Sequence, residues 1–346
     1  MNYFRLFLII GAVLLLGAAC APQQIQTSTD GGIWLSEDLG ENWDQRVIIY
    51  EDGTRKRTIA DINVKKLLFS PGDERKIFAV SESKGLWVSW NEGHNWDQIL
   101  ASSEINDVVI DINDPKIIYA AVGGFIVQTK DEGITWKSIY ASDLPTTKIT
   151  SITIDPKSRQ VIFAGTNEGN LLISENNGLA WRIQAKSAGG AILKLQFHPN
   201  KNATLYAGIE TKGLARSFDQ GKNWEFFDNA FAEFQDTNIF RDFSLVTSGI
   251  VYASKYGLLR SLNQGTDWTN LPLISGRKDS NIQAISTDPD NPIEVYYGTN
   301  STFYYSLDGG FNWVPRELPS TRSASTILIS SDNHKKIYLG VSRTRN

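Results

Sequence analysis

One eight-residue pattern occurs seven times in the chain, and this repeat limits the possible folds more than any other feature. The pattern is Ser/Thr-x-Asp/Asn-x-Gly-x-x-Trp, and its copies begin at Ser36, Ser89, Thr129, Ser174, Ser217, Ser261 and Ser306. The intervals between starts are 53, 40, 45, 43, 44 and 45 residues. Periods of this length are typical of propellers, solenoids and arrays, in which each repeat is one supersecondary unit. The spacing therefore predicts a single domain of similar units.

Each fixed position of the eight-residue repeat has a structural role in a tight turn between two strands. The Asp or Asn side chain can accept hydrogen bonds from nearby backbone N–H groups. The Gly supplies a positive φ, and the Trp buries roughly 150–250 Å². We assign all seven copies this structural role, through Ser36, Asp38, Gly40, Trp43, Ser89, Asn91, Gly93, Trp96, Thr129, Asp131, Gly133, Trp136, Ser174, Asn176, Gly178, Trp181, Ser217, Asp219, Gly221, Trp224, Ser261, Asn263, Gly265, Trp268, Ser306, Asp308, Gly310 and Trp313.

A second pattern precedes each copy of the repeat. It consists of an alternating strand, a turn containing Asp, Pro or Asn, a strand rich in Val, Ile, Tyr and Ala, and a glycine-containing loop, as in residues 149–169. Period-two alternation bounded by such turns predicts strands. One unit is therefore four strands. Six whole units fit the chain, and half units at 325–342 and 31–47 together complete a seventh, which would close the ring without a free sheet edge. The sequence thus predicts an all-β, seven-bladed β-propeller over residues 31–346.

The first twenty residues have the features of an export signal. A weakly positive start is followed by the apolar run 6–16 and by the small residues that precede Cys20, the single cysteine. The apolar run is shorter than a membrane span needs. Small residues before a cysteine resemble the bacterial lipobox, which implies cleavage after Ala19 and lipid attachment at Cys20. Ordinary cleavage after Ala21 is the alternative. We expect a signal peptide (1–20), a linker (21–30) and an exported, lipid-anchored envelope protein, which the mass of the mature N-terminus would check.

The eight-residue pattern resembles the Asp-box, or BNR, repeat of sialidases, sortilin-like receptors, xyloglucanases and photosystem II assembly-factor propellers. The resemblance covers the chain from about Gly31 to its end. It implies that the repeats lie at the blade periphery, away from any active or binding face. One ring with a lipoprotein-like start resembles most the photosystem II assembly and stability factors. The resemblance therefore implies a monomeric, membrane-anchored scaffold that binds a protein partner and is not an enzyme.

The alternative interpretation is a glycoside hydrolase or a carbohydrate-binding propeller. A sialidase would need an arginine cluster, a tyrosine nucleophile and an acidic partner, and its Phe-Arg-Ile-Pro motif is absent. Xyloglucanase chemistry needs two positioned carboxylates, and the enzymes of that kind usually pair two propellers. The net charge of −4 argues against nucleic-acid binding. We expect no cofactor and no metal site, because His94, His198 and His334 fall in separate turns.

Three long connections contain candidate partner-binding residues, since variable loops of a rigid scaffold often carry function. The longest connection, residues 47–61, accounts for the 53-residue interval. Residues 226–243 are rich in phenylalanine and are interpreted as an exposed apolar patch that binds a partner. The third group consists of basic residues in 275–280 and on either side of 318–320, and the basic residues are interpreted as a site for an acidic peptide or a carboxylate terminus. The alternatives are that the phenylalanines cap the ring and that the basic residues are merely solvated. The candidates are Arg55, Lys56, Arg57, Phe231, Phe234, Arg277, Lys278, Arg316 and Arg322.

Overall fold

The computed structural model describes residues 29–187, 189–199, 204–247, 249–274, 276, 281–291 and 293–343. Cys20 and the predicted signal peptide lie outside the described residues, and so do Arg277 and Lys278. The described residues form strands and turns and contain no helix, hence none that could cross a membrane. The prediction of an all-β chain is confirmed.

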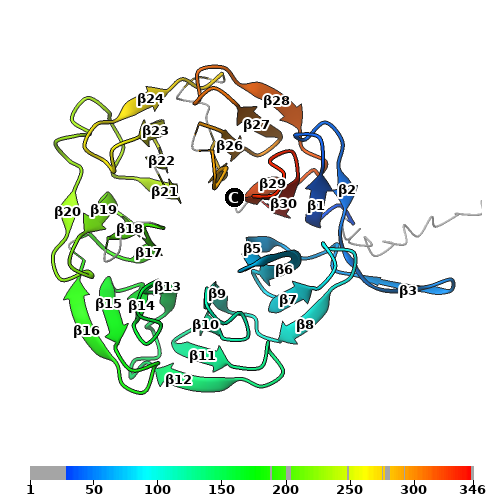
Figure 1. Cartoon of the computed structure of the whole chain (residues 1–346), viewed down its shortest axis with the longest axis horizontal. Helices are drawn as coiled ribbons and strands as arrows, with labels where there is room; N and C mark the ends of the chain where they lie inside the picture. The colour runs from blue at the N-terminus through cyan, green and yellow to red at the C-terminus, as the bar shows by residue number, and fades with distance from the viewer. Residues whose placement is uncertain are drawn as a thin grey trace, which may run out of the picture.

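Seven four-stranded antiparallel sheets, here called blades, surround a central axis (Figure 1). Within each blade the first strand lies nearest the axis and the fourth lies on the outside. Blades 1 to 3 contain β5 (Val64–Ser70), β6 (Asp73–Ser81), β7 (Leu86–Ser89), β8 (Asp97–Leu100); β9 (Ile105–Ile110), β10 (Ile118–Val122), β11 (Phe125–Thr129), β12 (Lys137–Ala141); β13 (Ile149–Ile154), β14 (Ile162–Thr166), β15 (Asn170–Ser174) and β16 (Arg182–Lys186). Blades 4 to 6 contain β17 (Ile192–Phe197), β18 (Leu205–Ile209), β19 (Gly213–Ser217), β20 (Glu225–Phe226); β21 (Phe240–Val246), β22 (Gly249–Ser254), β23 (Gly257–Ser261), β24 (Thr269–Leu271); β25 (Ala284–Thr287), β26 (Val295–Gly298), β27 (Thr302–Ser306) and β28 (Val314–Glu317).

The seventh blade is built from both ends of the chain, as the half units predict. Its inner strands are β29 (Ser323–Ile329) and β30 (Ile337–Ser342), and its outer strands are β1 (Gly32–Ser36) and β2 (Asp44–Gln45). β1 pairs with β30 over five residues, from Gly32 opposite Val341 to Ser36 opposite Ile337. This pairing closes the ring, so no blade edge is left at the junction.

The eight-residue repeat forms the turn between the third and fourth strands of every blade. In all seven copies the Gly N–H donates to the Ser or Thr hydroxyl at 2.7–3.0 Å. The Asp or Asn oxygen accepts from the backbone N–H four residues later at 2.8–2.9 Å. The indole N–H of Trp136 donates to the Ile99 carbonyl of the preceding blade at 2.8 Å. The repeat therefore holds its own turn and also joins neighbouring blades.

The residue before each repeat glycine also has positive φ, which the sequence pattern did not indicate. It is a non-glycine residue in six copies, for example Leu39 at 61° and Glu132 at 62°. In four of these copies this residue donates its N–H to a carbonyl in or next to the turn between the first two strands of the same blade, as Glu132 does to the Lys116 carbonyl at 3.1 Å. Both turns of a blade therefore lie on one side of the ring, here called the repeat face. The other side, where the inner strands begin, is called the mouth face.

A chain of buried polar contacts links the inner strands of blades 1 to 4. The Asp107 carboxylate lies 2.7 Å from Lys66 Nζ and accepts from the Ser151 hydroxyl and the Ile152 N–H, both at 2.9 Å. The Ser151 hydroxyl in turn accepts from the Leu195 N–H at 2.9 Å. Burial alone would raise the pKa of Asp107, but the Lys66 ammonium and these hydrogen bonds outweigh it and lower that pKa below its usual range.

Candidate binding site at the channel mouth

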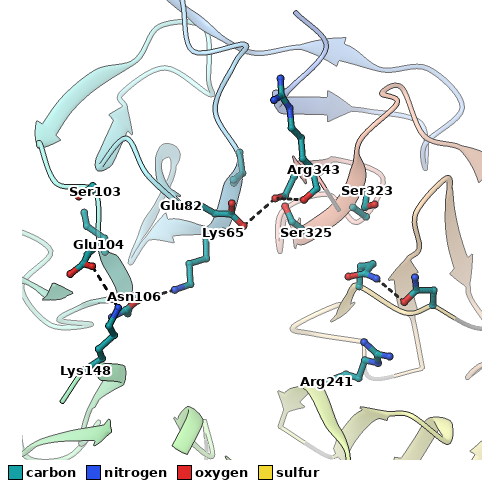
Figure 2. Close-up of a pocket in the computed structure, with 16 residues that line it drawn as sticks. Lys65, Glu82, Ser103, Glu104, Asn106, Lys148, Arg241, Ser323, Ser325 and Arg343 are labelled. Carbon is teal, nitrogen blue, oxygen red and sulfur yellow. Dashed lines mark hydrogen bonds and ion pairs between the residues drawn. The ribbon is translucent and has the colours of Figure 1, made fainter. Parts of the chain in front are cut away.

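A cavity of about 740 Å³ opens at the centre of the mouth face (Figure 2). Its lining comes from six of the seven blades, from the beginnings of the inner strands and from the ends of the second strands, where Glu82, Ser342 and Arg343 lie. Lys65, Asn106 and Arg241 are each the second residue of their inner strand, and Lys148 directly precedes another. Because side chains alternate along a strand, the same position in successive blades points toward the same opening. The ring thus gathers residues that are far apart in sequence.

The charges around this cavity are unbalanced in favour of cations. Lys65, Lys148, Arg241 and Arg343 face two carboxylates, Glu82 and Glu104, which leaves a formal charge of +4 − 2 = +2 on a protein whose net charge is −4. All four cationic residues are exposed. Figure 2 shows Arg241 and Lys148 on opposite sides of the opening. The mouth is therefore a local basic centre on an acidic protein, which favours anionic ligands.

The two carboxylates of the mouth are engaged by neighbouring side chains. Glu104 lies 3.6 Å from Lys148 Nζ. Glu82 accepts hydrogen bonds from the Asn63 amide at 3.1 Å and from the Ser342 hydroxyl at 3.2 Å. In the described part of the chain, by contrast, the guanidinium groups of Arg241 and Arg343 form no ion pair. These two groups are available to a carboxylate or another anion from outside.

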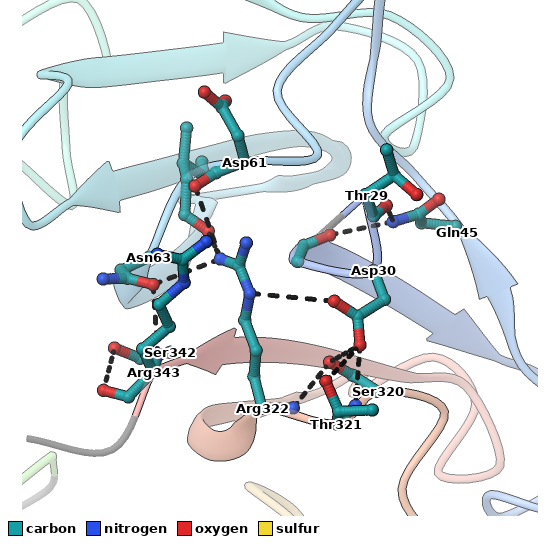
Figure 3. Close-up of polar contacts among 12 residues, drawn as sticks. Thr29, Asp30, Gln45, Asp61, Asn63, Ser320, Thr321, Arg322, Ser342 and Arg343 are labelled. Carbon is teal, nitrogen blue, oxygen red and sulfur yellow. Dashed lines mark hydrogen bonds and ion pairs between the residues drawn. The ribbon is translucent and has the colours of Figure 1, made fainter. Parts of the chain in front are cut away.

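Arg322, predicted as a partner-binding residue, is buried at the closure of the ring (Figure 3). Its guanidinium donates to the Ile62 carbonyl at 2.7 Å and to Asn63 Oδ1 at 3.1 Å, and it lies 3.9 Å from Asp30 Oδ1. The other oxygen of Asp30 accepts from the Thr321 N–H at 2.7 Å. Arg322 therefore joins blade 7, blade 1 and the beginning of the described chain. At 3% exposure it offers no surface to a partner.

The other basic candidates that the structure describes lie away from the mouth. Arg316 is on the outer strand β28, 3.9 Å from Glu41. Arg55, Lys56 and Arg57 are exposed on a hairpin that projects from the ring (Figure 1). The sequence predicts a long connection over residues 47–61, whereas the structure shows paired strands there, β3 (Ile48–Asp52) and β4 (Arg55–Thr58).

The two phenylalanine candidates pack into the interior, which corrects the expectation of an exposed apolar patch. Phe231 is 7% exposed, and its ring lies 5.5 Å from that of Tyr252 and 5.0 Å from that of Trp268. Phe234 is partly buried and packs edge-on against Tyr256, with ring centroids 5.1 Å apart. The alternative, in which these residues cap the ring, describes them better.

One group of possible metal ligands comes together on the repeat face. Ligand atoms of Asp288, Glu294 and His334 lie within 4.8 Å of one another. Asp288 Oδ1 accepts from the Asn291 N–H at 2.9 Å, and Glu294 accepts from the Asn291 amide at 2.8 Å and the Tyr296 hydroxyl at 2.9 Å. Turn hydrogen bonds therefore account for the position of both carboxylates.

No family model matches the sequence. A curated relative is the oligoxyloglucan-reducing end-specific xyloglucanase of Emericella nidulans, with 24% identity over 200 residues. The match covers 52% of this chain and 24% of the relative, so this chain spans about a quarter of that enzyme. This similarity contradicts the expectation that the protein is not an enzyme, because the relative is a xyloglucanase, which is a glycosidase.

Two kinds of solved structure share the fold. The GH74 enzyme of Niastella koreensis superimposes with a TM-score of 0.66 and 16% identity, covering 81% of this chain and 51% of that one. YCF48 bound to a D1 peptide superimposes with a TM-score of 0.62 and 15% identity, covering 81% of this chain and 93% of that one. At these identities the likeness concerns the fold. This chain is a seven-bladed propeller similar to both, and it matches the second over nearly that protein's whole length.

Proposed function

We propose that this protein binds an anionic peptide segment of a partner protein at the channel mouth. The observation that carries the proposal is the convergence of four exposed cationic residues on one cavity, two of which form no ion pair among the described residues. Charged groups that line a cleft concentrate ligands of the opposite sign and speed their association. YCF48, whose fold is similar, has been solved bound to a D1 peptide, which is an independent reason to favour a peptide as the ligand.

We further propose that the protein acts outside the cytoplasm and is held to a membrane through a lipid on Cys20. The sequence of residues 1–20 supports this, because small residues precede a lone cysteine behind a short apolar run. Several acyl chains, at about 0.8 kcal/mol for each buried methylene, would make such an anchor stable. Replacement of Cys20 by serine should move the protein from the membrane fraction to the soluble fraction. If both forms fractionate alike, the anchor proposal is wrong.

The mouth can be tested by titrating the protein with a fluorescein-labelled hexaglutamate peptide at low ionic strength. The double variant Lys65→Glu and Arg241→Glu should weaken binding at least about 30-fold, because each reversal changes a close charge–charge interaction by about 1 kcal/mol or more. Binding to the native protein should also fall steeply with added salt.

The matched control is the double variant Lys137→Glu and Lys186→Glu. These lysines are exposed on the outer strands β12 and β16, and the net charge changes by the same amount. We expect this control to bind within about threefold of the native protein, since charges beyond a Debye length are largely screened. Equal losses in the two double variants would show a non-specific charge effect and would rule out the mouth as the site.

A second candidate function is the binding or hydrolysis of a β-glucan, which the match to the xyloglucanase favours. Glycoside hydrolysis uses two carboxyl groups that flank the scissile bond, and Glu82 and Glu104 are the two carboxylates that line the mouth cavity. Xyloglucan oligosaccharides should then yield new reducing ends, and Glu104→Gln should lower the rate at least about 100-fold. Glu175→Gln on the repeat face is the control. Rates equal to the protein-free blank would reject hydrolysis, and the absence of binding heat when the same oligosaccharides are titrated into the protein would reject binding.

A further inference from the structure

The hairpin β3–β4 presents a strand edge that nothing in the described chain covers. It forms the one two-stranded sheet of the described residues, and β4 pairs with β3 on one side only (Figure 1). The hairpin projects from the ring at the connection between blade 7 and blade 1. An unpaired strand edge offers a row of N–H and C=O groups to which another extended chain can bond.

The register of the hairpin shows which backbone groups face outward. Asp52 lies opposite Arg55 across a two-residue turn, and Glu51 lies opposite Lys56. In such a hairpin the pair next to the turn exchanges hydrogen bonds, and the following pair does not. The N–H and C=O of Lys56 therefore point away from β3, toward the open side of β4.

A groove of about 400 Å³ runs beside β4 and the residues that follow it. Its lining includes the apolar side chains of Ile49, Ile59 and Trp87 and the charged side chains of Arg57, Asp61 and Lys84, of which Lys84 and Asp61 form an ion pair. Ile59 and Trp87, at 1% and 8% exposure, belong to the core of blade 1, and Ile49 is half-buried. The groove therefore offers little apolar surface, so the open edge of β4 and its charges carry the binding of an extended chain.

The charges on β4 indicate the chemistry of the added chain. Lys56 lies 3.4 Å from Glu51, while Arg55 and Arg57 form no ion pair within the described residues. Edge-to-edge pairing of β4 with a second copy would place these cations against one another, and like charges directly opposite are destabilising. An acidic strand would meet opposite charges instead.

We propose that β4 is a second docking site, which accepts an extended, acidic segment of a partner protein as the third strand of the hairpin sheet. Main-chain hydrogen bonds at Lys56 provide the register. Arg55 and Arg57, which form no ion pair within the described residues, attract the carboxylates. The site is separate from the channel mouth and does not depend on the function proposed there.

The test uses a capped, fluorescent octapeptide in which valine alternates with glutamate, measured by fluorescence anisotropy. Proline at position 56 removes the outward N–H, whereas threonine keeps it and removes the same charge. We expect Lys56→Pro to weaken binding about tenfold and Lys56→Thr only about twofold, since one main-chain hydrogen bond separates the two variants. Both variants should retain the thermal unfolding midpoint of the native protein, because the hairpin lies outside the ring.

The controls distinguish an acidic partner strand from other possible occupants of the β4 edge. The counterpart peptide with lysine in place of glutamate should bind at least about tenfold more weakly. The proposal is overturned if the proline and threonine variants bind the acidic peptide equally, or if the lysine peptide binds as well as the acidic one. It is also overturned if light scattering shows a dimer of the native protein that Lys56→Pro dissociates, because the edge would then serve self-pairing.

Discussion

Replacement of Arg322 by leucine is expected to lower the free energy of unfolding by about 3–5 kcal/mol, the cost of breaking a buried charged pair. The guanidinium contacts Asp30 and residues 61–63, which are distant from Arg322 in the sequence. It thereby joins both segments to the start of β29. Its loss leaves the Ile62 carbonyl without its 2.7 Å partner and weakens the junction at which the ring closes. Chemical denaturation followed by tryptophan fluorescence would measure the change.

Arg316→Leu is the matched control for Arg322→Leu. Arg316 lies six residues earlier and contacts Glu41 at 3.9 Å, with the Glu41 side chain 68% exposed. Exposed pairs of this kind contribute about 0–1 kcal/mol. If Arg322→Leu costs no more than Arg316→Leu, the buried arginine does not stabilise the ring closure.

Removal of the Asp107 carboxylate should destabilise the protein by about 3 kcal/mol or more, since Lys66 and three further donors, the Ser151 hydroxyl and the N–H groups of Val108 and Ile152, lose this acceptor. Asp107→Ala is the direct variant, and Asp97→Ala, at an exposed position on β8, is the control with the same change of residue type. We expect the control to stay within about 0.5 kcal/mol of the native protein. Equal losses of stability in Asp107→Ala and Asp97→Ala would show that the polar contacts between the inner strands do not stabilise the protein.

The Asp107 network also predicts how stability depends on pH. The pKa of Asp107 is lower in the folded protein than its usual value, so the folded state binds this proton less readily than the unfolded state. The stabilisation is therefore complete above the ordinary aspartate pKa of about 4 and is lost as the pH falls through the lower, folded value. The difference in stability between native protein and Asp107→Ala should accordingly shrink at acidic pH.

The ring could be predicted from the sequence because the residues that close each turn lie within one copy of the repeat. The Ser, Asp, Gly and Trp of one copy close a turn with hydrogen bonds that span only four residues, as in residues 129–136. Seven such turns determine seven blades, and the half units at the two ends have no other partner than each other. The hydrogen bonds within each turn and the closure of the ring therefore favour the same structure, which is typical of sequences that specify one fold.

The mouth could not be predicted in the same way, because its residues share no local pattern. Lys65, Lys148, Arg241 and Arg343 come from four blades and meet only when the ring is complete. The sequence pattern favours long connections, whereas the mouth is built from the beginnings of inner strands and the ends of second strands. A comparison of the second residue of each inner strand, such as Lys65, Asn106 and Arg241, would have been the available signal.

Burial explains the candidates that the structure reassigns. Arg322 lies in a short polar connection, and such segments are usually exposed to solvent. In the closed ring, however, Asp30 and the beginning of blade 1 cover Arg322. Phe231 sits in a connection too, but Tyr252 and Trp268 cover it. The hairpin had a weak local signal, since the two-residue turn between its strands, Gly53-Thr54, begins with glycine, a frequent residue of hairpin turns.

Locating a bound peptide is the most direct test of the proposed mouth site. A hexaglutamate peptide with a photoreactive benzophenone can be crosslinked to the native protein, and the attachment sites can be mapped by mass spectrometry. We predict crosslinks to residues 64–65, 103–106, 148, 241 and 343, which line the cavity. Crosslinks confined to the repeat face, for instance at the exposed Ile134 and Leu179, would contradict a binding site at the mouth.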